Sequence, residues 1–144
     1  MGRSSTFLTI ALVAIGLAFL LNIAPIGSNG MSAVNISHGE IRGAALSHEN
    51  KLYTLNFNQQ ETLIDLINRS IPVGAPDVQR GGTPPDFEKV VLYRFGEPEV
   101  TLRPILYLSD GSLIYTIPGL HGEGYLQDVT SGEMKKLLSQ SYDH

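Results

Sequence analysis

The residue types that could do chemistry gather in a tripeptide that occurs twice. Histidine, glycine and glutamate follow one another at residues 38–40 and again at residues 121–123. Imidazole nitrogens and carboxylate oxygens are ligands that zinc and related divalent ions accept, so two such pairs could close one site. The candidate metal ligands are therefore His38, Glu40, His121 and Glu123.

The same tripeptide also has a simpler interpretation. A histidine two residues before a glutamate is a short pattern that arises by chance. Both copies fall in predicted loops, where polar residues are expected. The deaminases that use this spacing also need cysteine ligands, and the chain contains no cysteine. We therefore expect no cofactor, and a zinc titration tests the metal-binding alternative.

Other recognisable catalytic motifs are absent from the sequence. It contains no Gly-x-Ser-x-Gly nucleophile elbow, no P-loop and no Gly-x-Gly-x-x-Gly after a predicted strand. The lack of cysteine also excludes thiol catalysis, thiolate metal sites and a disulfide scaffold. These absences favour a non-enzymatic protein, and an unrecognised hydrolase stays as an alternative.

The net charge of the chain limits which classes of molecule it could bind. The chain has 144 residues, enough for about one domain, and a formal net charge of −4. The part after residue 30 holds 9 basic and 14 acidic residues, which gives 9 − 14 = −5. An acidic domain is repelled by phosphate backbones and anionic headgroups. We therefore expect no nucleic-acid partner.

Residues 7–26 differ from the rest of the chain because they are 20 consecutive residues without a charge. As a helix they would span about 30 Å, the thickness of a hydrocarbon core. The segment is thus predicted to be a transmembrane helix in contact with the lipid bilayer. A retained signal-anchor and a cleaved signal peptide both fit. The length favours the anchor, because a signal h-region has about 7–15 residues.

Topology follows from the flanking charge. Arg3 is the only charged residue before the apolar segment, which favours a cytoplasmic N-terminus. The chain then divides into a signal-anchor at residues 1–26, a tether at 27–35 and an extracytoplasmic domain at 36–144. This domain would be periplasmic or extracellular. Secretion after signal cleavage is the alternative.

The domain itself is predicted to be α+β. Alternating apolar residues indicate strands, Asn58 and Thr130 begin helices with glutamate three residues on, and prolines and glycines mark loops. The expected order is a β-hairpin at 40–46 and 51–57, a helix ending before Pro72, a long loop at 71–86, a three-stranded antiparallel meander at 88–95, 100–108 and 112–117, a glycine-rich loop at 118–128, and a final helix.

Turn lengths predict the register of the meander. A two-residue turn at Asp110-Gly111 would pair Tyr107 with Ile114, and a four-residue turn at 96–99 would pair Phe95 with Val100. One face is then almost wholly apolar and should be the core. It collects Val91, Tyr93, Phe95, Val100, Leu102, Pro104, Leu106, Leu108, Leu113, Tyr115 and Ile117.

The opposite face of the meander mixes apolar and polar residues, whereas a sheet face in contact with water should be polar. It also carries Leu92, Thr101 and Thr116. An apolar centre with an arginine-bearing rim is typical of interaction surfaces, although a loop folded over this face would also explain it. The candidate residues for partner binding are Val90, Arg94, Arg103, Ile105, Tyr107 and Ile114.

These observations together predict a membrane-tethered, non-enzymatic adaptor or accessory subunit of an envelope or membrane assembly. We expect a protein partner or self-association through the mixed sheet face. The alternative is an extracytoplasmic domain that binds a small ligand or a metal through the two loops that contain histidine.

Overall fold

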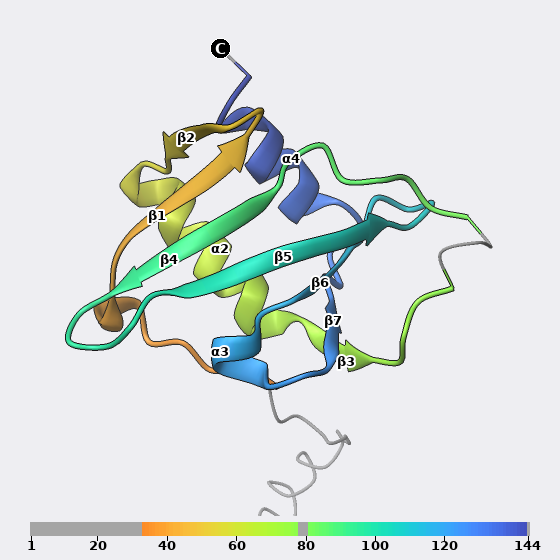
Figure 1. Ribbon diagram of the computed structural model, residues 1–144. Helices are drawn as coiled ribbons and strands as arrows, with labels where there is room; N and C mark the ends of the chain where they lie inside the picture. Colours follow the sequence, from red (N-terminus) through yellow and green to blue (C-terminus); the bar gives the residue numbers. More distant parts are fainter. Residues whose placement is uncertain (1–32, 78–80, 144) are drawn as a thin grey trace, which may run out of the picture. The chain divides into compact units, whose positions relative to one another are not determined.

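A computed structural model describes residues 33–77 and 81–143. These residues form an α+β domain with one sheet, as the sequence predicts (Figure 1). Its elements in chain order are η3 (His38–Glu40), β1 (Ile41–His48), β2 (Lys51–Thr54), α2 (Phe57–Arg69), β3 (Ile71–Val73), β4 (Lys89–Arg94), β5 (Val100–Tyr107), β6 (Leu113–Thr116), α3 (Pro118–His121), β7 (Tyr125–Gln127) and α4 (Glu133–Gln140).

The sheet has seven strands in the order β2-β1-β4-β5-β6-β7-β3, and each neighbouring pair is antiparallel. The predicted hairpin and meander are confirmed, and β1 joins them by pairing with β4. Two three-residue strands lie where only loop was expected, so that part of the prediction was wrong. Strand β3 contains Pro72 at a sheet edge, where a residue without an N–H is tolerated.

Helix α2 begins two residues earlier than predicted. Asn56 is the N-cap instead of Asn58, because its side chain accepts from the Gln59 N–H at 2.8 Å. The Gln59 side chain in turn accepts from the Asn56 N–H at 2.8 Å, which completes a capping box. Asn58 therefore lies inside the first turn of the helix.

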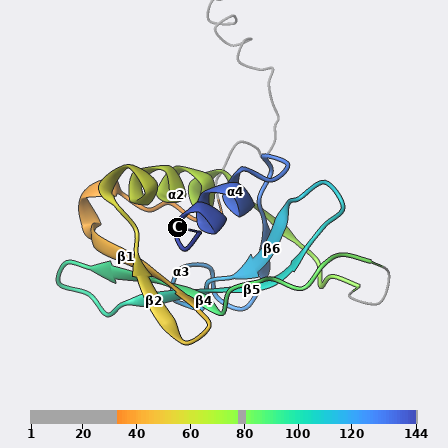
Figure 2. The same ribbon diagram turned by 90° about the horizontal axis from the view of Figure 1, so that it is seen from above.

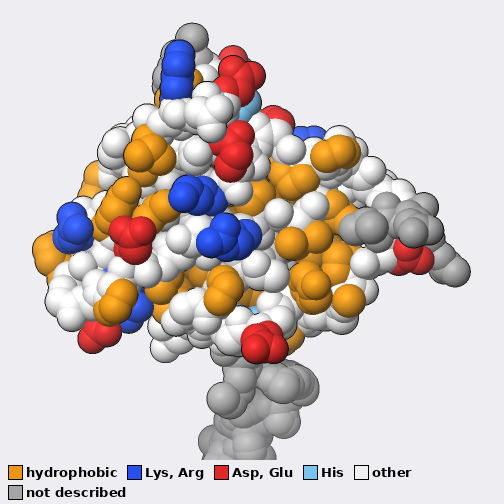
Figure 3. Space-filling model, viewed as in Figure 1, with side chains coloured by type: hydrophobic (Ala, Val, Ile, Leu, Met, Phe, Trp, Pro, Cys, Tyr) orange, Lys and Arg blue, Asp and Glu red, His pale blue; other side chains and the backbone are white. Residues whose placement is uncertain are grey.

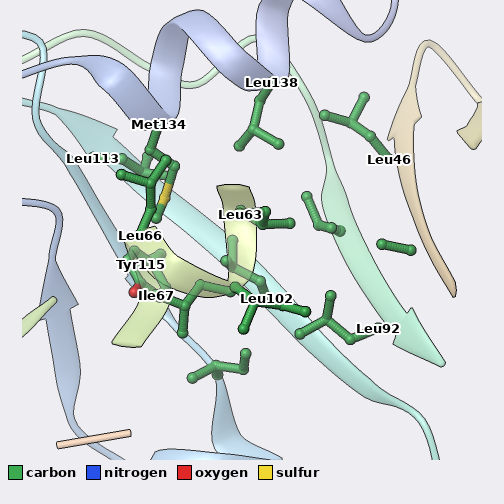
Figure 4. Packing of buried hydrophobic residues seen from close by; sticks show 14 of the residues in the cluster. Leu46, Leu63, Leu66, Ile67, Leu92, Leu102, Leu113, Tyr115, Met134 and Leu138 are labelled. Carbon is green, nitrogen blue, oxygen red and sulfur yellow. The ribbon is translucent and has the colours of Figure 1, made fainter. Parts of the chain in front are cut away.

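Helices α2 and α4 lie on the same side of the sheet (Figure 2). The side of α2 that faces the sheet holds Leu63, Leu66 and Ile67, which are at most 1% exposed. Met134 and Leu138 bring α4 onto the same core. Figure 4 shows these helical side chains packed against Leu92 and Leu102 and other residues of the sheet.

The predicted transmembrane segment, residues 7–26, lies outside the described residues, as does most of the tether. Among helices of the described ranges, none combines the length and the apolar character needed to cross a bilayer. The first described residues already belong to the core, because Val34 and Ile36 are each 3% exposed and lie in the core cluster.

Candidate partner-binding face of the sheet

One face of the sheet is left open by the two longer helices of the described domain, and we call it the open face. Strand pairing shows which side chains share it. Ala45 lies opposite Val91 on β1 and β4, and Leu106 lies opposite Ile114 on β5 and β6. Figure 3 shows this face with hydrophobic side chains spread across it.

These four apolar side chains are buried without joining the helix-covered core. Ala45, Val91 and Ile114 are each 5% exposed, and Leu106 is 4% exposed. None of the four belongs to the core cluster that α2 and α4 contact. They therefore form a second, thinner apolar layer, which continues at the sheet edge to Leu52, 62% exposed.

Basic residues are set into this layer. Arg103 is exposed and lies opposite Thr116, and Lys89 is half-buried and lies opposite Ser47. The Arg42 guanidinium lies 5.3 Å from the centre of the Tyr93 ring, within cation–π range. Figure 3 shows two basic side chains side by side near the middle of the face.

The predicted partner-binding residues do not share one surface. Val90 is fully buried and Tyr107 is 2% exposed, and both belong to the helix-covered core. Arg94 shares the core-side alternation of β4, and its guanidinium lies 3.7 Å from Glu40. Arg103 and Ile114 do lie on the open face, whereas Ile105 is half-buried at a break in the register.

Register explains these corrections. The ladder pairs Leu92 with Val100, where Phe95 was expected opposite Val100, so β4 is shifted by three residues. An odd shift moves every side chain of a strand to the other face. Tyr93 consequently lies on the open face, and Phe95 is 61% exposed instead of buried.

The second half of β5 is inverted by a bulge. The register breaks between Pro104 and Leu106, and Tyr107 then pairs with Leu113. The extra residue of a bulge reverses the alternation of the residues that follow it. Leu106, expected in the core, therefore lies on the open face, and Tyr107 takes the core position.

The candidate metal ligands are not brought together. His38 contacts two carboxylates of α2, Glu40 contacts Arg94, and His121 belongs to α3. Glu123 is exposed in the loop that follows. Within the described ranges no three His, Asp or Glu side chains form a group that could hold a metal ion.

His38 instead fastens the entering chain to α2. Its Nδ1 lies 2.6 Å from Glu61 and its Nε2 2.8 Å from Asp65, one helical turn apart. Hydrogen bonds to Glu61 and then to Asp65 raise the pKa of His38 above its usual value. Asn68 adds two further bonds, because its amide pairs with both the N–H and the carbonyl of Ile36.

A second polar network, which sequence reasoning missed, is centred on Asp86. Its carboxylate accepts hydrogen bonds from Tyr107 at 3.3 Å and from Tyr142 at 2.5 Å. The His48 ring stacks on Tyr142 at 3.9 Å and its Nδ1 lies 2.6 Å from the Asp86 carbonyl oxygen.

Burial and the nearby carboxylate raise the pKa of Tyr142 to about 12 and raise that of Tyr107 further. Both hydroxyls therefore stay protonated at neutral pH and donate to Asp86. The network ties the C-terminal residues to the end of β1 and to the loop before β4. No sequence pattern predicts this network, because its members come from four distant segments.

Comparisons of this chain with known protein families, with curated proteins and with solved structures gave no match.

Proposed function

We propose that this chain is a membrane-tethered adaptor that binds a protein partner through the open face of its sheet. Residues 7–26 would hold it in the bilayer with the N-terminus in the cytoplasm, and the domain would act on the opposite side. The open face supports this proposal, because the outward side of an antiparallel sheet in contact with water is ordinarily polar.

The observation that carries the proposal is the apolar layer outside the core. Ala45 and Val91 form one cross-strand pair, and Leu106 and Ile114 form another. A domain that needed only one core could place polar residues at all four positions without losing contact with α2 or α4. Apolar residues at these positions, with basic side chains among them, have the composition of a protein interface.

Site-specific photocrosslinking in native membranes tests the proposal. A photoreactive benzoylphenylalanine replaces Thr101, which lies opposite Val91 on the open face, in the full chain. The matched control places it at Thr62, which is exposed on α2. Membranes are washed with alkaline carbonate before irradiation, so that only integral proteins and their firmly bound partners remain.

The expected result is a discrete higher-mass adduct from position 101 and none from position 62, with the chain retained in the washed membranes. Release of the chain by carbonate would contradict the membrane tether. Equal labelling at both positions, or no adduct from position 101, would contradict partner binding by the open face.

A further inference from the structure

The charges of the sheet are all of one sign. Its seven strands contain five basic residues and no aspartate or glutamate, although the chain holds 14 acidic residues. The acidic residues lie in helices, turns and loops. Lys51 is in the edge strand β2, and Arg94 is paired with Glu40. The remaining three, Arg42, Lys89 and Arg103, lie on the open face.

Two of these basic residues are neighbours on central strands. The ladder pairs Val90 with Leu102, so the register continued by one residue brings Lys89 opposite Arg103. Like charges directly opposite each other destabilise a sheet. Lysine is also used to protect sheet edges, but β4 and β5 lie inside the sheet and need no such protection.

No carboxylate of the described ranges forms an ion pair with Arg42, Lys89 or Arg103. Arg42 contacts the Tyr93 ring, which leaves its positive charge without an anion. In a domain whose net charge is −5, the strands of the open face thus contribute only positive charges, set among apolar side chains. An incoming acidic group would relieve the repulsion between Lys89 and Arg103.

We propose that the partner presents a protein segment in which carboxylates alternate with apolar side chains. This inference rests on the proposed function, since it names the chemistry of the partner that the open face binds. Apolar side chains of the partner would cover the four buried residues, and its carboxylates would pair with Lys89 and Arg103. Such charge complementarity determines the choice and orientation of a partner more than the affinity.

Peptide binding to the full chain in phosphatidylcholine nanodiscs tests the inference. The probes are three fluorescent twelve-residue peptides that share leucine, serine and glycine positions and differ only in carrying glutamate, glutamine or lysine. Fluorescence anisotropy is read at 50 mM and 500 mM NaCl. The variant K89Q/R103Q is compared with R69Q/K136Q, which removes the same charge from exposed positions on α2 and α4.

The glutamate peptide should bind about tenfold more tightly than the other two at 50 mM NaCl, and the advantage should shrink at 500 mM because salt screens exposed charges. K89Q/R103Q should weaken its binding about fivefold, the effect of losing two surface ion pairs, whereas R69Q/K136Q should leave it unchanged. These results would support an acidic partner.

Equal binding of the glutamate and glutamine peptides, or equal losses in the two variants, would overturn the inference. Absence of binding by all three peptides would overturn it as well. If photocrosslinking from position 101 succeeded all the same, the proposed function would stand with a partner of other chemistry. A gain in binding to phosphatidylglycerol nanodiscs that replaced peptide binding would point to a lipid surface and would also overturn it.

Discussion

The two faces of the sheet carry similar side chains but bury them by different means. Leu102 on the covered face is fully buried under α2 and α4, and Leu106 on the same strand is 4% exposed with neither helix above it. On the covered face, α2 and α4 bury the apolar side chains of the sheet. On the open face no long helix of the described ranges covers these side chains, and at Leu106 the loop that contains Gly82 and Thr83 lies beside β5.

Truncating one leucine on each face should give the largest difference. Leu102→Ala should cost about 3 kcal/mol, because it opens a cavity inside an enclosed core. Leu106→Ala should cost about 1 kcal/mol, since water or neighbouring side chains can enter the space. Both free energies of unfolding come from urea denaturation of the full chain in micelles. Equal losses would show that the open face is packed as tightly as the core.

Removing one tyrosine hydroxyl from each face should give a smaller difference in stability between the two faces. The Tyr115 hydroxyl is buried and donates to Ser70 at 2.6 Å, and Ser70 donates to the Leu66 carbonyl at 3.0 Å. Tyr115→Phe should cost about 1 kcal/mol, the net value of one buried hydrogen bond.

The control for this prediction is Tyr93→Phe on the open face. The Tyr93 ring is half-buried beneath Arg42, and its hydroxyl makes no hydrogen bond to any residue of the described ranges. Its removal should leave the free energy of unfolding unchanged. If the two variants lost equal stability in the same urea titration, the hydroxyl bond to Ser70 would not be the cause.

Local signals predicted the longer elements but not β3, α3 or β7, and long-range pairing decided which face each side chain takes. Alternation and capping residues identify the hairpin, the meander and the α2 stripe, because each signal lies within one short segment. The candidate face depended on the exact pairing of Leu92 and the bulge before Leu106. Pro104 signals a bulge or an edge, because it cannot donate a ladder hydrogen bond, and the register does break beside it. The sequence shows neither how that bulge shifts the pairing nor that Leu92 lies opposite Val100. Each of the two reverses a strand segment, so only Arg103 and Ile114 of the six predicted residues lie on the open face.

The polar contacts at the ends of the domain were even harder to predict from the sequence. His38 stood out as a metal ligand, yet its partners are Glu61 and Asp65, which lie more than 20 residues further along the chain. The i, i+4 spacing of these two carboxylates places them on one helix face. The sequence shows this spacing, but no sequence pattern predicts that the two carboxylates contact His38.

The smallest effect concerns this attachment on the helix-covered side and should depend on pH. A protonated His38 is positively charged and has an N–H on each ring nitrogen, 2.6 Å from Glu61 and 2.8 Å from Asp65, whereas the neutral ring has one N–H and no charge. The pKa of His38 is therefore raised from 6.5. Its stabilising contribution is fully present below the pKa of the unfolded chain and is lost as pH rises through the higher folded value.

The melting temperature of the native chain should therefore exceed that of His38→Ala at pH 5.5, and the difference should disappear by pH 9. The variant His121→Ala controls for loss of a histidine elsewhere in the domain. A His38→Ala difference that persisted unchanged at pH 9 would mean that the ring acts by packing and not by charge.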